Sequence, residues 1–122
     1  MMEFRMRVIS RSTLTRFVET LAGKKDAVAV RTALESWFHE TERAAWRNSQ
    51  DIKRAYSTAS IVGAERVVFN IKGNSYRLIT SIDYQRQTLF IKWIGSHKDY
   101  DSIDARTVEY GHQTYQNRPR SR

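Results

Sequence analysis

The sequence predicts an α+β domain in which two N-terminal helices pack on a small, mainly antiparallel sheet. Helical periodicity fills much of the first half of the chain, and three strand-like runs follow between residues 66 and 95. Separate runs of helices and strands are typical of this class. The 122 residues, of which 40% are hydrophobic, suffice for one domain with a modest core.

Two amphipathic helices are expected after a short strand at residues 6–10. The first covers about residues 13–22, with Ser12 as its cap and Gly23 at its end. The second runs from a cap at Asp26 to about Arg47. Apolar residues follow helical spacing in both: Leu14, Phe17, Val18 and Leu21 in the first, and Val30, Leu34, Trp37, Phe38, Thr41 and Ala45 in the second. The two helices should form an antiparallel hairpin.

A polar region and three strands follow the helices. Residues 51–56 favour a short helical turn that holds Lys53 and Arg54. Strands are expected at about residues 66–72, 75–84 and 88–95. The run Lys72-Gly73-Asn74-Ser75 is typical of a tight hairpin turn between the first two strands.

The turn at Gly73 predicts the strand register. It places Asn70 opposite Arg77 and Phe69 opposite Leu78, and paired residues share a face. The face toward the helices should collect Val67, Phe69, Ile71, Tyr76, Leu78 and Ile82, and the other should collect Arg66, Val68, Asn70, Lys72, Arg77 and Ile79. If residues 85–86 form the next turn, Lys92 faces Ile79 on the polar face. Leu89, Ile91 and Trp93 then join the buried face, although a one-residue slip would reverse this.

The charge indicates a polyanionic partner. The net charge of +8 and the pI of about 10.1 favour nucleic acid. Cysteine is absent, so disulfides and thiolate metal sites are excluded. No apolar run reaches membrane-spanning length and the N-terminus lacks a secretory signal, so we expect a soluble cytoplasmic protein without a membrane partner. Residues 111–122 read as a flexible basic tail.

Cations and one imidazole on the sheet suit phosphodiester chemistry. Arg66, Arg77 and Lys92 could stabilise charge on a phosphate, and His97, directly after the last strand, could transfer a proton. The alternative is that the arginines form ordinary surface ion pairs and that His97 only bonds backbone. His39 and His112 are interpreted as bystanders. No ligand spacing indicates a metal, and no cofactor is expected.

Two motifs resemble a known family. The patterns F-N-x-x-G-N-x-Y-R-L at residues 69–78 and G-S-H-K-D-Y-D at residues 95–101 resemble the HigB toxins of bacterial toxin–antitoxin pairs, within the RelE-like superfamily. The resemblance covers residues 6–108, which implies one RelE-like toxin domain. The opening M-R-V-I-S-R-S-T-L is similar to a HigB start, so residues 1–5 are interpreted as an N-terminal extension.

The resemblance implies an mRNA interferase that cuts mRNA in the ribosomal A site. A cognate helix-turn-helix antitoxin would neutralise it, and operator DNA would be reached only through that antitoxin. The chain itself offers cations and an imidazole but no carboxylate cluster for magnesium, so we expect cleavage that needs no metal and proceeds by attack of the RNA 2′-hydroxyl. By this resemblance His97 is the catalytic acid and Arg77 binds the scissile phosphate. The looser matches are Arg66, Lys53 and Lys92, and the Tyr100 position holds an aromatic residue in some relatives, which would stack on a base. We expect Arg66 and Lys92 to take part in catalysis, and Lys53, Arg54, Asn70, Lys72 and Tyr100 to bind RNA.

Two other functions remain open from the sequence. One is a non-catalytic nucleic-acid-binding module. The other is a ParE-like toxin that blocks another target, such as a topoisomerase. A target-blocking toxin needs no proton donor, so His97 favours the nuclease over the second alternative. Asp83 and Tyr84 stay open as helpers for the missing general base.

Overall fold

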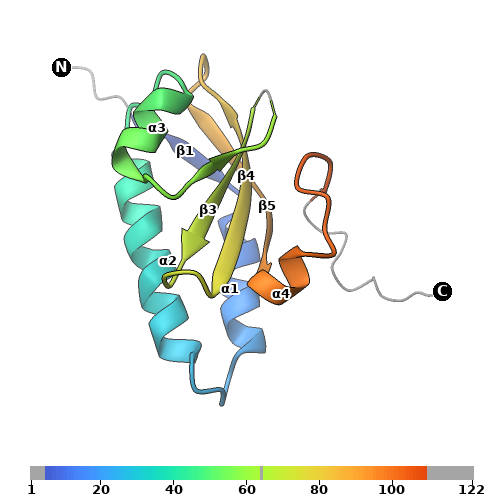
Figure 1. The fold of residues 1–122 in the computed structure, drawn as a ribbon. Coiled ribbons are helices and arrows are strands. Elements are labelled where there is room, and N and C mark those ends of the chain that lie inside the picture. Colours follow the sequence, from blue (N-terminus) through green and yellow to red (C-terminus); the bar gives the residue numbers. More distant parts are fainter. Residues whose placement is uncertain (1–4, 64, 110–122) are drawn as a thin grey trace.

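The structure, a computed structural model, describes residues 5–63 and 65–109 (Figure 1). The expected extension at residues 1–5 falls mostly outside the described residues, and the basic tail at residues 111–122, with His112, lies entirely outside them. The elements follow in the order β1 (Arg7–Ile9), α1 (Arg11–Thr20), α2 (Ala27–Glu42), α3 (Ser49–Ala55), β2 (Ser60–Ile61), β3 (Arg66–Ile71), β4 (Tyr76–Asp83), β5 (Thr88–Ser96) and α4 (His97–Tyr100).

The α+β class is confirmed, but the sheet is mixed. Its strand order is β1-β5-β4-β3-β2. The β2–β3, β3–β4 and β4–β5 pairs are antiparallel, whereas β1 runs parallel to β5. The helical hairpin of α1 and α2 connects the first strand with the rest of the sheet and covers one face of it (Figure 1). The short helix α4 lies on the other side.

The ends of the two long helices differ from the sequence expectation. Helix α1 begins at Arg11, so the cap position belongs to Ser10, which has a φ of 73° and makes no side-chain capping bond. The prediction of Ser12 as the cap was therefore wrong. Helix α2 ends at Glu42 rather than near Arg47. Ala45 therefore lies beyond the helix, where it is exposed and not part of the apolar face. Within the described residues, no helix is both long and apolar enough to cross a membrane.

The predicted register of the first hairpin is confirmed. Asn70 pairs with Arg77, and Phe69 pairs with Leu78. The face toward α1 and α2 carries the main core, in which Trp37 packs edge-on against Phe69 at 5.4 Å between ring centroids. This core contains all the residues of β3 and β4 predicted for that face, Val67, Phe69, Ile71, Tyr76, Leu78 and Ile82, and two of the three predicted from β5, Leu89 and Ile91.

A β-bulge changes the second hairpin. Ile79 pairs with Trp93 and Thr80 pairs with Ile91, so Lys92 is an extra residue without an opposite partner. A bulge places two successive residues on nearly the same face. Lys92 does lie on the face predicted for it, but it does not oppose Ile79. The prediction that Trp93 joins the helix-facing core was wrong.

The second face of the sheet carries a small core of its own. Val68, Ile79 and Trp93 are buried there, with 5% or less of each exposed. The chain after α4 runs back across this face and covers it (Figure 1). The residues that cover it are Tyr100, Ile103, Ala105 and Val108, with Val62 from the β2–β3 connection. This layer was not expected, since the sequence loses its periodicity beyond Ile103.

Candidate functional site

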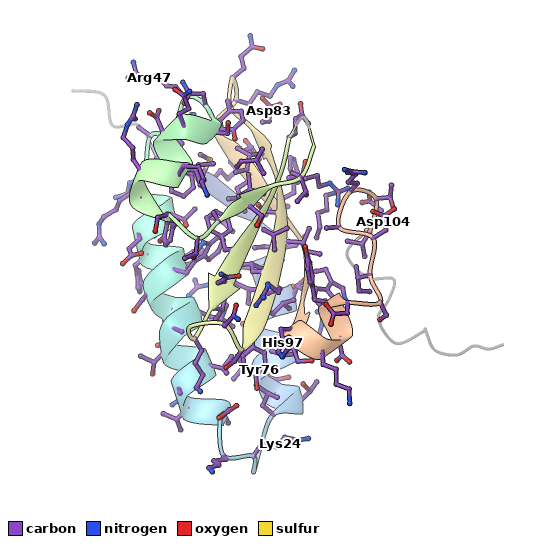
Figure 2. All side chains as sticks on the ribbon, in the orientation of Figure 1. Lys24, Arg47, Tyr76, Asp83, His97 and Asp104 are labelled. Carbon is purple, nitrogen blue, oxygen red and sulfur yellow. The ribbon has the colours of Figure 1, made fainter. Side chains whose placement is uncertain are left out.

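His97 lies at the end of the sheet where β5 ends and where the β3–β4 turn joins its two strands. Its backbone N–H donates to the Ser75 carbonyl at 2.9 Å, and its side chain is exposed. Ser96 caps the short helix α4 by accepting a hydrogen bond from the Asp99 N–H at 3.1 Å. Figure 2 shows His97 beside Tyr76 at this end of the molecule. The imidazole is therefore accessible and held by ordered backbone on both sides.

Arg77 lies close to this end, on the face that carries α4. It pairs with Gly95 of β5, two residues before His97. Its Nη1 donates to the Asn74 carbonyl at 2.9 Å, and its guanidinium lies 5.6 Å from the centroid of the Tyr100 ring. Tyr100 in turn lies 6.4 Å from the Trp93 ring, measured between centroids. A cation and two aromatic rings thus form a continuous layer at the end of the sheet where His97 follows β5.

Asn70 and Lys72 belong to the same region. Asn70 is the cross-strand neighbour of Arg77 and is partly exposed. Lys72 lies in the β3–β4 turn with a φ of 54°, and its Nζ is 3.6 Å from a carboxylate oxygen of Asp26. Asp26 also accepts a hydrogen bond from the Tyr76 hydroxyl at 3.2 Å. The structure therefore brings Arg77, Asn70 and Tyr100 together on one face at the end of the sheet where His97 follows β5, whereas Lys72, which was predicted for the same face, reaches Asp26 at the start of α2 instead.

Arg66 and Lys92 lie further along the sheet and share one carboxylate. Arg66 Nη2 is 3.1 Å from Oε2 of Glu109, and Lys92 Nζ is 2.9 Å from Oε1. Arg66 also donates to the carbonyls of Val108 at 2.7 Å and Ala105 at 3.3 Å. The hydrogen bond from Lys92 is the largest cause that holds the pKa of Glu109 below its ordinary value. Both cations are thus engaged by the C-terminal part of the described chain.

Lys53 and Arg54 lie on α3, at the opposite end of the molecule from α4 (Figure 1). Lys53 Nζ donates to the carbonyls of Ser57 at 2.8 Å and Ala59 at 2.7 Å, which fixes the loop after the helix. Arg54 is 71% exposed and pairs with Asp51 at 2.6 Å. Lys53 therefore has a structural contact in this conformation, and neither residue lies near His97.

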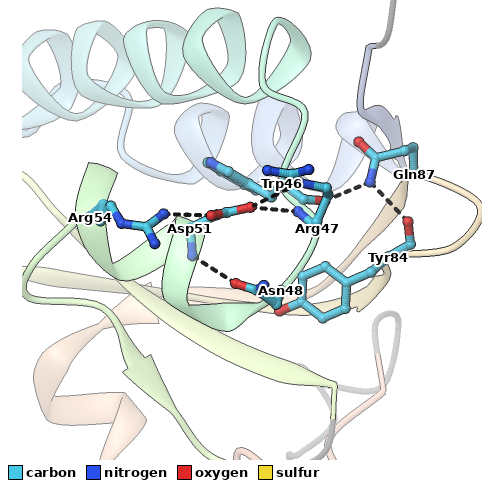
Figure 3. A network of polar contacts seen from close by, with 7 residues as sticks. All are labelled: Trp46, Arg47, Asn48, Asp51, Arg54, Tyr84 and Gln87. Carbon is cyan, nitrogen blue, oxygen red and sulfur yellow. Dashed lines mark hydrogen bonds and ion pairs between the residues drawn. The ribbon is translucent and has the colours of Figure 1, made fainter.

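Asp51 organises the region around α3 (Figure 3). Its carboxylate accepts from the Arg47 N–H at 2.9 Å as well as from Arg54, and the Arg47 backbone bond is the main cause that lowers its pKa. The side chain of Gln87 links the same region to the β4–β5 turn by donating to the carbonyls of Trp46 at 2.6 Å and Tyr84 at 2.8 Å. The network anchors α3 to the far end of the sheet.

Asp83 and Tyr84, which were open as helpers of catalysis, also lie at that far end. Figure 2 labels Asp83 near one end of the sheet and His97 near the other. Asp83 accepts from the N–H of Arg86 and pairs with its guanidinium, both at 3.0 Å, which lowers the pKa of Asp83. In the described part of the chain, no group of three or more His, Cys, Asp or Glu side chains is placed to hold a metal ion.

Three residues of this face were missed by sequence reasoning. Trp93 carries the aromatic layer under Tyr100, and Gly95 leaves room for its indole, since a Cβ there would lie 2.4 Å from Cη2 of Trp93. The W-I-G spacing was a possible signal for this pair, because residues i and i+2 of a strand share a face. Glu109 gave no signal, because nothing in the sequence indicates which cation a distant acid meets.

Comparison with known proteins identifies the family. A comparison with curated proteins gave no match. A family model described as HigB toxin, the RelE-like toxic component of a toxin–antitoxin system, matches residues 30–103, from the first turn of α2 to just beyond α4. The match spans more than half of the chain and includes both strand hairpins, Arg77 and His97. The chain therefore belongs to the HigB family of RelE-like toxins of toxin–antitoxin systems.

Proposed function

We propose that this toxin is a ribosome-dependent endoribonuclease that cleaves mRNA. One observation carries the proposal: an exposed imidazole follows β5 at the end of the sheet where Arg77 pairs with Gly95, and the Arg77 guanidinium faces the Tyr100 ring. An imidazole transfers protons near neutral pH, and a guanidinium binds phosphate oxygens in a fork. These are the two functions that cleavage of a phosphodiester requires.

The proposed reaction uses RNA itself as the nucleophile. The 2′-hydroxyl oxygen attacks the adjacent phosphorus, the bond from phosphorus to the 5′ oxygen breaks, and His97 gives its proton to that oxygen. The proton of the 2′-hydroxyl leaves to solvent or to a ribosomal group. Arg77 stabilises the charge on the phosphate, and Tyr100 stacks on a base. The products are a 2′,3′-cyclic phosphate and a 5′-hydroxyl, and no metal or other cofactor takes part.

The partners follow from this proposal. The family implies an antitoxin, which we propose to be a HigA-like helix-turn-helix protein that alone contacts operator DNA. The message would be held in the ribosomal A site, where positioning by the ribosome supplies much of the rate. Lys72, Asn70 and Arg54 are proposed as further contacts to RNA. Ribosomes and mRNA are found in the cytoplasm, so we propose that the activity takes place there.

The test compares two histidine variants in cleavage of mRNA on programmed ribosomes. His97→Gln keeps hydrogen bonding but removes proton transfer, so single-turnover cleavage should fall by ~10²–10⁴-fold. His39→Gln is the control, because His39 is also exposed but lies on α2. A rate for His97→Gln within a few-fold of the wild type would remove His97 from catalysis. If growth arrest also persisted, a target-blocking toxin would be favoured.

A 2′-deoxy nucleotide at the cleavage position of the message tests the nucleophile separately. Cleavage should stop at that position while ribosome binding persists. Undiminished cleavage there would exclude attack by the 2′-hydroxyl.

A further inference from the structure

The carboxylate of Glu109 bridges two largely buried cations, Lys92 and Arg66. One carboxylate oxygen binds Lys92 and the other binds Arg66, at 2.9 and 3.1 Å. The side chains of Lys92 and Arg66 are only 19% and 13% exposed, whereas that of Glu109 is 53% exposed. The carboxylate therefore lies at the surface, over two cations that come from separate strands, β5 and β3.

The two cations meet on one face of the sheet. They lie on either side of β4, and the bulge at Lys92 turns its side chain onto the face that Arg66 occupies. Taking positive charge out of water is unfavourable unless an anion compensates it. The two cations therefore need an anion with two acceptor oxygens on this face. The carboxylate of Glu109 is such an anion.

A phosphodiester offers the same arrangement as this carboxylate. Its two non-bridging oxygens share one negative charge, as the two oxygens of a carboxylate do, and arginine binds carboxylates and phosphates with the same fork of N–H groups. Arg66 pairs with Ser81, four residues along β4 from Arg77, which corresponds to about 13 Å at the rise of a strand. Because residues 100–108 cover the sheet between these positions, an RNA strand from Arg77 would pass over that segment to reach the exposed carboxylate of Glu109.

We propose that Arg66 and Lys92 form a second phosphate-binding site, for the RNA backbone away from the scissile bond, and that Glu109 occupies it until RNA replaces the carboxylate. The site rests on the proposed function, because it takes RNA as the ligand. It assigns Arg66 and Lys92 to RNA positioning and gives Glu109 an inhibitory role. Arg66 keeps its bonds to the backbone carbonyls of Ala105 and Val108, so the exchange requires only the Glu109 side chain to leave.

The test measures binding of a short 2′-O-methyl RNA, which cannot be cleaved by 2′-hydroxyl attack, to the full chain. Glu109→Gln should bind this RNA several-fold more tightly at low salt. The plot of log K against log salt should steepen by about 0.7, the slope that one additional neutralised phosphate contributes. In the double variant Glu109→Gln/Lys92→Met the tighter binding should disappear, while methionine preserves much of the apolar stem of the lysine.

Glu19→Gln is the matched control. It removes the same charge from an exposed position on α1, so its effect measures bulk charge alone. Equal tightening by Glu19→Gln, or tighter binding that persists with Lys92→Met, would overturn the proposal. So would a lower Tm for Glu109→Gln with unchanged RNA binding, because Glu109 would then be only a tether of the chain end.

The outcome is independent of catalysis. If His97→Gln cleaves normally on ribosomes while Glu109→Gln binds RNA more tightly as predicted, the catalytic assignment fails and the phosphate site stands. If cleavage requires His97 but the affinity of Glu109→Gln for RNA matches the wild type, the catalytic assignment stands and the phosphate site is refuted.

Discussion

Gly95 leaves space that the indole of Trp93 fills, so we predict that Gly95→Ala destabilises the fold. A Cβ at position 95 would lie 2.4 Å from Cη2 and 2.6 Å from Cζ2 of Trp93. Gly95 does not have a positive φ, so the alanine would meet a steric obstacle rather than backbone strain. Relief requires the indole to move, yet Trp93 is only 5% exposed and packs against Val68 and Ile79.

The size of the effect follows from the room available. Inserting a methyl group into a packed core typically destabilises by about 1–3 kcal/mol. Because the obstacle is a rigid ring rather than a flexible side chain, we expect about 2–3 kcal/mol. A loss of ~2 kcal/mol lowers the Tm by roughly 8 °C for a chain of this length. The displaced indole would also disturb Tyr100, so cleavage should fall together with stability.

Thermal unfolding of four proteins tests the reasoning: the wild type, Gly95→Ala, Trp93→Leu and the double variant. Leucine does not reach over position 95, so the alanine should be almost neutral in the Trp93→Leu background. The difference between the two backgrounds gives the coupling energy of the pair. An unchanged Tm for Gly95→Ala, or an equal loss in both backgrounds, would refute the steric explanation.

Three further predictions concern the cations and the acid that binds two of them. Arg77→Lys keeps the charge but loses the fork, so single-turnover cleavage should fall by roughly 10²–10³-fold, whereas Arg86→Lys at the other end of the sheet should cleave normally. Lys53→Met removes two hydrogen bonds to backbone carbonyls, so chemical denaturation should show a loss of about 1–3 kcal/mol; a separate cleavage assay on ribosomes would show whether RNA binding is lost too. Because its folded-state pKa is lowered, Glu109 stabilises the fold above its ordinary pKa of 4.5, and this contribution is lost as the pH falls below that value. The Tm difference between the wild type and Glu109→Gln should therefore be constant near neutral pH and shrink below pH 4.5; a difference that grows on acidification would contradict this sign.

Local sequence signals were sufficient where one turn determined the register. The Lys72–Ser75 turn is short and contains a glycine with a φ of 62°. It aligned Asn70 with Arg77, and alternation along the strands then predicted which side chains face the helices. The position of His97 directly after β5 followed from the same periodicity.

The second hairpin could not be predicted in the same way. A bulge adds one residue to one strand, and no composition rule marks where that residue lies. Lys92 and Trp93 consequently share a face, although strict alternation would separate them. The burial of Trp93 also depends on Tyr100 and the chain beyond α4, whose irregular backbone has no periodic pattern to read.

The groups that each cation already contacts distinguish the cations with a structural role from the one that is best placed to bind RNA. Lys53 is held by two backbone carbonyls, and Arg66 by two carbonyls and a carboxylate. Arg77 differs, because in the described part of the chain its guanidinium meets backbone carbonyls and the Tyr100 ring, and no carboxylate bonds to it. A phosphate can therefore bind Arg77 without first displacing an acid, whereas at Arg66 and Lys92 it must compete with Glu109. Because Glu109 already binds Arg66 and Lys92 but no acid among the described residues binds Arg77, we expect substitutions of Arg77 to change the rate of the chemical step. Substitutions of Arg66 and Lys92 should instead change the affinity for the message.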